Sequence, residues 1–103
     1  MPKFVNAVKV SDIPDPGKRT VELDGHSLVI FHVGGRFWAT DGLCTHESAP
    51  LGEGELDGFE IECPWHGARF DIRDGRALTL PATRPICVHA VKIEGDDVFV
   101  EIE

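Results

Sequence analysis

Two short segments of the chain carry the residue types that bind transition metals. The first is Cys44-Thr45-His46, and the second, Cys63-Pro64-Trp65-His66, begins after sixteen intervening residues. Each segment offers one thiolate and one imidazole, so together they supply four ligands of two kinds, in the pattern C-x-H-x₁₆-C-x₂-H. Thiolate and imidazole are ligands for zinc and for iron-sulfur centres. The sequence therefore predicts a metal site held by Cys44, His46, Cys63 and His66.

The way the ligands are paired favours one class of metal centre. A structural zinc finger usually groups its cysteines in one knuckle and its histidines on a helix. A two-iron cluster with two thiolates on one iron and two imidazoles on the other needs one cysteine and one histidine from each of two facing loops. The spacing therefore resembles that of the Rieske [2Fe-2S] family, and Pro64 and Gly67 also match the family's second loop. Mononuclear zinc and a degenerate, empty site remain as alternatives.

The resemblance covers nearly the whole chain and implies a fold. Rieske domains are antiparallel β-sandwiches in which a smaller subdomain, carrying the cluster at its tip, is inserted in the sequence of the base. It implies an all-β protein with one Rieske domain over residues 1–103 and a cluster-binding subdomain at about residues 41–80. It also implies one [2Fe-2S] cluster per chain on the four ligands above. Leu80-Pro81-Ala82 falls where the family often has a loop that shields the cluster, and the alternative is that Pro81 is an ordinary loop proline.

The apolar pattern independently predicts strands rather than helices, because no long run repeats with a 3.6-residue period. Strands are expected around residues 4–10, 21–23, 28–31, 37–39, 59–61, 70–72, 86–93 and 98–102. Dipeptides typical of tight turns separate them. These are Asp24-Gly25, Gly34-Gly35, Asp57-Gly58, Asp74-Gly75 and Gly95-Asp96.

Composition limits the partners. The chain has 103 residues and a formal net charge of -8, which argues against nucleic acid and anionic membranes and favours a basic protein partner. Glu47, Glu53 and Glu55 are candidates for an acidic rim around the surface where such a partner would dock. The first residues have no apolar signal core and no stretch reaches membrane-spanning length, so we expect a soluble, cytoplasmic protein. We also expect a monomer. Cys87 has no cysteine left to pair with, which fits a reducing compartment.

Departures from the respiratory Rieske branch bear on the reduction potential. That branch has an additional disulfide, which Ala49 and Trp65 exclude here, and it has serine and tyrosine hydroxyls that donate to sulfur where this chain has Ala68 and Phe70. Each missing hydrogen bond makes it harder to add an electron. We expect a potential toward the low end of the Rieske range and no quinol oxidation. The chain instead resembles the soluble Rieske ferredoxins of bacterial aromatic-ring dioxygenase systems.

That resemblance implies a carrier without substrate chemistry of its own. It would accept one electron at a time from an NAD(P)H-dependent flavoprotein reductase and pass it to a terminal Rieske oxygenase, an aromatic-ring-hydroxylating dioxygenase, with both partners docking near His46 and His66. Two alternatives remain open. One is the small Rieske subunit of an assimilatory nitrite reductase, and the other is a zinc-stabilised binding module.

The remaining polar candidates are given structural roles. His26 is next to a turn, while His32 and His89 fall in strand patterns, so we expect them to be structural or solvated. Cys87 alternates with apolar neighbours and is expected to be a small packing residue. Trp65 has two open interpretations, a contact surface for partners and a core residue.

Overall fold

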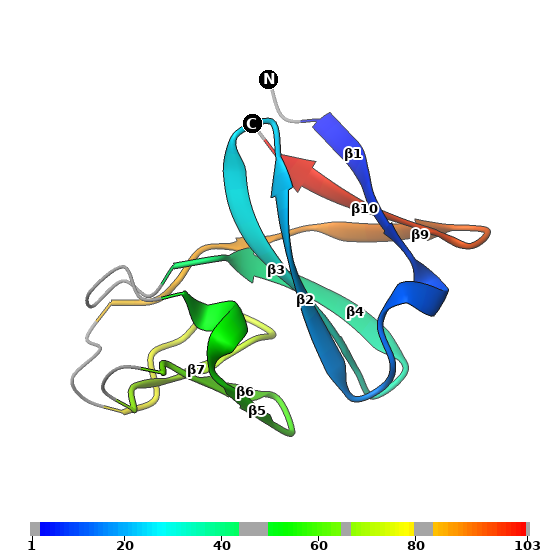
Figure 1. Ribbon diagram of the computed structural model, residues 1–103. Helices are drawn as coiled ribbons and strands as arrows, with labels where there is room; N and C mark the ends of the chain where they lie inside the picture. The colour runs from blue at the N-terminus through cyan, green and yellow to red at the C-terminus, as the bar shows by residue number, and fades with distance from the viewer. Residues whose placement is uncertain (1–2, 44–49, 65–66, 80–83, 103) are drawn as a thin grey trace.

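The computed structural model describes residues 3–43, 50–64, 67–79 and 84–102. Within these ranges ten strands form three antiparallel sheets, which confirms the all-β prediction (Figure 1). The terminal sheet contains β1 (Lys3–Lys9), β10 (Asp97–Ile102) and β9 (Val91–Glu94), in that order. The central sheet contains β2 (Gly17–Leu23), β3 (His26–Val33), β4 (Arg36–Asp41) and β8 (Val88–His89). The small sheet contains β5 (Glu55–Asp57), β6 (Glu60–Glu62) and β7 (Arg69–Asp71).

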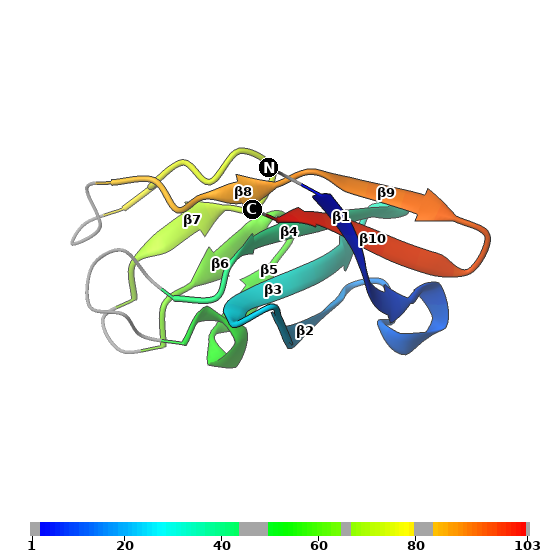
Figure 2. The ribbon, with the colours of Figure 1, turned by 90° about the horizontal axis from the view of Figure 1, so that it is seen from above.

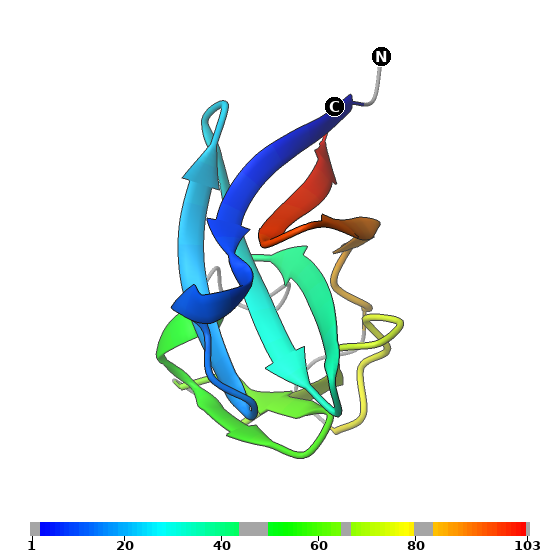
Figure 3. The same cartoon turned by 90° about the vertical axis from the view of Figure 1, so that its right-hand side faces the viewer.

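Strand β3 belongs to two hydrophobic cores at once. Its residues Leu28 to Phe31 are all at most 1% exposed, and successive side chains of a strand point to opposite faces. Leu28 and Ile30 pack with the terminal sheet, in a core that includes Val98 and Val100. Val29 and Phe31 pack on the other face, in a core that includes residues of the small sheet. The central sheet therefore lies between the other two sheets (Figures 1 and 3).

One predicted strand is two strands in the structure. The apolar run at residues 86–93 divides into β8, which pairs with β4, and β9, which pairs with β10 of the terminal sheet. The chain changes sheets at Ala90, whose carbonyl accepts a hydrogen bond from the N–H of Glu101 at 2.9 Å. Figure 2 shows β8 and β9 as successive segments that link the two sheets. A continuous apolar pattern cannot show this change of partner, because both sheets need the same residue types.

The first strand also ends earlier than expected. β1 stops at Lys9, and Val10 begins a short 3-10 helix, η1 (Val10–Asp12). The register of β1 against β10 shifts between Asn6 and Val8, as at a β-bulge, where one strand has an extra residue. The shift explains why the apolar positions of this segment do not alternate strictly.

Most predicted turns close hairpins where expected. Asp24-Gly25, Gly34-Gly35 and Gly95-Asp96 each join two paired strands. The turn expected at Asp57-Gly58 lies one residue later, since Asp57 still pairs with Glu60. The small sheet lies between β4 and β8 in the chain, and the subdomain limits at about residues 41–80 stay a prediction.

Replacing Phe31 by alanine tests the burial of β3 in the core that it shares with the small sheet. Phe31 is 0% exposed, so Phe31→Ala should lower the free energy of unfolding by about 3–5 kcal/mol through lost burial and a cavity. Phe4 is the matched control, because it is 38% exposed, and Phe4→Ala should cost less than about 1 kcal/mol. Denaturant unfolding measures the loss of unfolding free energy in each variant. Equal losses for the two variants would contradict the placement of Phe31 in the core between β3 and the small sheet.

Candidate metal centre

Cys63 is the one predicted ligand that the structure describes. It follows β6, and its free thiol is 1% exposed within the core that also contains Ala68 and Phe70. Its backbone N–H donates to the carbonyl of Ala68 at 2.6 Å, and its own carbonyl accepts from the N–H of Gly67 at 3.1 Å. Gly67 has a φ of +73°, a conformation that glycine adopts without the steric cost other residues meet. These two hydrogen bonds hold the backbone of Cys63 against that of Gly67 and Ala68.

The base of the first predicted arm is also held by backbone hydrogen bonds. The N–H of Gly42 donates to the carbonyl of Ser27 at 2.8 Å, and the carbonyl of Gly42 accepts from the N–H of Leu51 at 2.9 Å. Leu43 and Pro50 form an isolated antiparallel bridge. The two ends of the arm are therefore paired with each other and attached to β3.

The other predicted ligands, Cys44, His46 and His66, lie outside the described residues. The same holds for Glu47, Ala49, Trp65 and Pro81. The ligand set therefore stays a prediction. In the part of the chain that the structure describes, no three side chains of histidine, cysteine, aspartate or glutamate form a group suited to a metal ion.

The surroundings of Cys63 fit an iron-sulfur centre. A thiolate is the protein ligand that iron-sulfur clusters use most, and this one is a free thiol next to apolar side chains rather than at an open surface. Ala68 and Phe70 are both 0% exposed, so water is excluded from this side of the arm. Solvent exposure is one of the properties that set the potential of such clusters.

Close packing between the short helix η2 (Leu51–Glu53) and β6 positions the two arms relative to each other. Gly54 follows η2, and a Cβ added there would overlap the carbonyl oxygen of Glu62, the residue before Cys63. The N–H of Gly54 also donates to the carbonyl of Leu51 at 3.0 Å. Glycine is required here by the space available, and the contact brings the end of the first arm against the start of the second.

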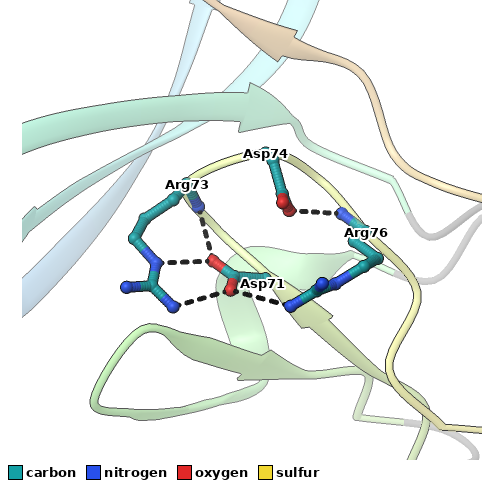
Figure 4. A network of polar contacts seen from close by, with 4 residues as sticks. All are labelled: Asp71, Arg73, Asp74 and Arg76. Carbon is teal, nitrogen blue, oxygen red and sulfur yellow. Dashed lines mark hydrogen bonds and ion pairs between the residues drawn. The ribbon is translucent and has the colours of Figure 1, made fainter.

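A buried carboxylate fixes the chain after the second arm (Figure 4). Asp71 is 4% exposed, and it accepts hydrogen bonds from the backbone N–H of Arg73 at 2.9 Å and from the guanidinium of Arg73 at 3.0 and 2.8 Å. Arg76 lies 3.7 Å from the same carboxylate. The hydrogen bond from the Arg73 side chain is the largest cause that lowers the pKa of Asp71. Asp71 therefore stays ionised and holds the turn that follows β7.

The outer face of the small sheet is strongly acidic. Glu55 is directly opposite Glu62, and Asp57 is directly opposite Glu60, so like charges face each other across the strands. Arg69 lies among them, 3.0 Å from Glu62, 3.4 Å from Glu60 and 3.8 Å from Asp57. One arginine only partly compensates the carboxylates of this face.

Two of the remaining histidines hold the framework, as predicted. The Nδ1–H of His32 donates to the carbonyl of Ile13 at 2.8 Å, and its ring stacks on Phe37 with 4.1 Å between centroids. The Nε2–H of His89 donates to the carboxylate of Asp41 at 2.8 Å. His26 is exposed at the start of β3.

The prediction for Cys87 is wrong. Its side chain is exposed rather than packed, whereas its neighbour Ile86 is 2% exposed. The residue precedes β8 at the edge of the central sheet, so its side chain faces solvent while that of Ile86 enters the core.

Fold and site together define a small all-β domain in which the buried thiol of Cys63 directly follows strand β6 of a separate small sheet. The Rieske [2Fe-2S] domain family matches residues 3–96. The chain is 43% identical to the ferredoxin component of a naphthalene 1,2-dioxygenase system of Pseudomonas aeruginosa, over 97% of this chain and 96% of that protein. The chain belongs to the Rieske [2Fe-2S] domain family, and a [2Fe-2S] cluster is its cofactor.

Solved structures agree with this assignment. The Sphingomonas yanoikuyae B1 ferredoxin superposes with a TM-score of 0.92 at 34% identity, over 98% of this chain and 100% of that one. A chain from a complex of reduced oxygenase and oxidised ferredoxin in carbazole 1,9a-dioxygenase superposes with a TM-score of 0.90 at 37% identity, over 94% and 91%. Relatives of this kind are named as ferredoxin components and not as catalytic subunits. No helix among the described residues is long and apolar enough to cross a membrane.

Removing the Asp71 carboxylate should destabilise the protein in a pH-dependent way. Asp71→Asn should lower the free energy of unfolding at pH 7 by about 1–3 kcal/mol, because charge-assisted hydrogen bonds from Arg73 are lost. The pKa of Asp71 is lowered in the folded state, so its contribution is full above the unfolded pKa of about 3.9 and is lost as the pH falls through the folded pKa.

Denaturant unfolding at several pH values measures this difference. The wild-type and Asp71→Asn curves should be separate at pH 7, begin to approach each other only below about pH 4, and converge as the pH falls through the lower pKa of folded Asp71. Asp24→Asn is the control, since the Asp24–Lys3 pair is more than half exposed and its loss should have a smaller effect. A gap between wild type and Asp71→Asn that persists unchanged at low pH would show that shape rather than charge is responsible.

Proposed function

We propose that this protein is a one-electron carrier between an NAD(P)H-dependent flavoprotein reductase and a terminal aromatic-ring-hydroxylating dioxygenase. The observation that carries the proposal is the match to ferredoxin components of dioxygenase systems over almost the full length of both chains. A further relative is the ferredoxin component of a p-cumate 2,3-dioxygenase system of Pseudomonas putida, 48% identical over 76% of this chain. We further propose that the carrier is a cytoplasmic monomer.

Four residues would hold the cluster, namely Cys44, His46, Cys63 and His66. When bound, a Rieske [2Fe-2S] cluster accepts and releases one electron without a change in protein ligands. The chain's own contribution is rigidity and exclusion of water. The turn between Cys63 and Ala68 fixes one thiolate, and the paired backbone at Leu43 and Pro50 fixes the base of the other arm, so little reorganisation accompanies electron transfer.

The surroundings of Cys63 support a low reduction potential for this class. Rieske centres range from about -150 to +300 mV, and hydrogen bonds to the sulfurs raise the potential. Ala68 and Phe70 are buried beside Cys63 and have no hydroxyl to donate. We place the potential toward the low end of the range, which suits transfer to another Rieske centre rather than oxidation of a quinol.

The docking face is proposed to surround His46 and His66, with an acidic rim that attracts basic partners. Glu53 and Glu55 are exposed, and the carboxylates of β5 and β6 continue the same charge over the small sheet. Charge of one sign around a docking face raises the association rate with partners of opposite charge.

Electron paramagnetic resonance of the reduced protein, with iron and zinc counted on the same sample, tests the carrier function. We expect two irons per chain, as in a [2Fe-2S] cluster, and a rhombic signal with the low average g value of a histidine-ligated cluster. Cys63→Ser should abolish or strongly alter the signal, whereas Cys87→Ser should retain it, because Cys87 is exposed and outside the predicted ligand set. One zinc per chain without an electron paramagnetic resonance signal would instead identify the protein as a zinc-stabilised binding module.

Neutralising the acidic rim should slow association with redox partners. The double variant Glu53→Gln/Glu55→Gln should reduce the second-order rate of electron transfer to the oxygenase about 2- to 10-fold at low ionic strength. The difference should disappear at about 1 M salt, where the Debye length is about 3 Å. Stopped-flow kinetics over a series of salt concentrations measure the electron-transfer rate and its dependence on salt.

A matched control is Glu22→Gln, which removes an exposed carboxylate from β2 of the central sheet. It should leave the rate within about twofold of wild type, because a single exposed charge outside the rim contributes little to steering. Equal slowing by Glu22→Gln would indicate an effect of net charge, and no slowing by the double variant would remove Glu53 and Glu55 from the docking face.

A further inference from the structure

The second ligand arm leaves the small sheet at a single pair of residues. Glu62 is directly opposite Arg69, in the last pair of the ladder between β6 and β7. Glu62 is followed by Cys63, and Arg69 comes three positions after the predicted ligand His66. The N–H of Cys63 donates to the carbonyl of Ala68 at 2.6 Å, so the two ends of the arm leave the sheet side by side. The spacing of this pair therefore sets the spacing of the arm's two ends.

An ion pair joins the two side chains at this position. The guanidinium of Arg69 lies 3.0 Å from the carboxylate of Glu62, compared with 3.4 Å from Glu60 and 3.8 Å from Asp57. The Glu62 side chain is 34% exposed, whereas that of Asp57 is 82% exposed. Partial burial strengthens the attraction, because water screens it less. Arg69 is thus held most closely to the residue that precedes Cys63.

The backbone of Arg69 is held from its other side. Its N–H donates to the hydroxyl of Thr79 at 2.9 Å, and its carbonyl accepts from the N–H of Leu78 at 2.8 Å. The next residue, Phe70, forms an isolated antiparallel bridge with Ala77. Residues 77–79 therefore lie along β7. With its backbone fixed in this way, Arg69 has less freedom to lose when its side chain pairs with β6.

Removing Arg69 would do more than break one ion pair. Glu55 is directly opposite Glu62 on β5, and Glu60 lies two residues from Glu62, on the same face of β6. Like charges that are directly opposite destabilise a sheet, and β6 has only three residues to resist this repulsion. Without the guanidinium, the repulsion would act on the residue next to Cys63.

We propose that Arg69 is a positioning residue for the second ligand arm, and that its ion pair with Glu62 holds the two ends of the arm together. This inference rests on the proposed ligand set, in which Cys63 and His66 share the arm. It extends that set, because neither Arg69 nor Glu62 is a ligand. The buried core stabilises the small sheet as a whole, and the Glu62–Arg69 pair acts locally, by limiting how often the arm opens.

Release of iron from the oxidised protein with its cluster to an excess of EDTA tests this proposal. Arg69→Gln should release iron about two- to fivefold faster than wild type, as expected when one partly exposed ion pair is lost. Arg69→Lys should be intermediate, because an ammonium group keeps the charge but cannot bridge several carboxylates as a guanidinium does. The difference between wild type and Arg69→Gln should shrink at about 1 M salt, where the Debye length is about 3 Å.

A double-mutant cycle separates the ion pair from other effects of Arg69. Glu62→Gln should accelerate release less than Arg69→Gln, because it removes an opposed carboxylate together with the ion pair. The double variant Glu62→Gln/Arg69→Gln should release iron no faster than Arg69→Gln, since the interaction is already lost. Arg19→Gln is the matched control, because it removes the same charge from an exposed position on β2, and it should keep the wild-type rate.

Two further measurements distinguish positioning of the arm from general destabilisation. Hydrogen exchange followed by mass spectrometry should become faster in Arg69→Gln for peptides that cover residues 62–69 and stay unchanged for peptides from β1 and β10. The electron paramagnetic resonance lines of the reduced Arg69→Gln protein should broaden, because the imidazole of His66 would take up a wider range of orientations. Those of Arg19→Gln should match wild type.

Three outcomes would overturn the proposal. These are wild-type iron release by Arg69→Gln, single-variant effects that multiply in the double variant, and faster exchange spread evenly over all sheets. With a normal cluster signal in the wild type, each would leave the carrier function standing. A wild-type protein without a [2Fe-2S] signal would remove the carrier function, and the exchange comparison would still decide whether Arg69 holds the arm. If Arg69→Gln does not fold, Arg69→Lys is compared with wild type, and Arg19→Lys is its control.

Discussion

The fold depends on one strand that buries both of its faces. β3 places Leu28 and Ile30 in the core shared with the terminal sheet, and Val29 and Phe31 in the core shared with the small sheet. A chain of this length buries a limited share of its surface, so a strand that serves two cores uses its apolar residues efficiently. As a result, the small sheet, which leads into Cys63, and the terminal sheet, which contains the last strand β10, both pack against β3.

The position of Cys63 follows from this arrangement. The small sheet packs on β3 through buried residues such as Ile61 and Phe70, and Cys63 continues directly from β6 within the same core. The carbonyl of Ser27, next to the buried run of β3, accepts the hydrogen bond that anchors the first arm. Both arms are therefore attached to one rigid strand. Asp71 adds a second restraint at the end of β7 by binding Arg73 and Arg76, so that the backbone on either side of the second arm is held.

The sequence predicts what local patterns determine and does not show what tertiary pairing determines. Turn dipeptides such as Gly34-Gly35 locate hairpins because their backbone conformations suit few other residues. The division of residues 86–93 at Ala90 could not be predicted, since β8 and β9 have the same apolar character and differ only in their partners. The exposure of the Cys87 side chain could not be predicted for the same reason, since it depends on tertiary pairing and not on the local apolar pattern. The sequence also does not determine which neighbour Asp71 pairs with, because residues two apart, such as Asp71 and Arg73, face each other only in the particular turn that follows β7.

The distribution of charge has opposing effects on stability and on recognition. Opposed carboxylates such as Glu55 and Glu62 on the small sheet destabilise the sheet that supports Cys63, and Arg69 offsets part of that repulsion. The buried core beneath them, rather than their mutual interactions, must hold the sheet together. On the proposed docking face, the same carboxylates would give a field that attracts basic proteins, so the charge that weakens the small sheet would serve recognition of a partner.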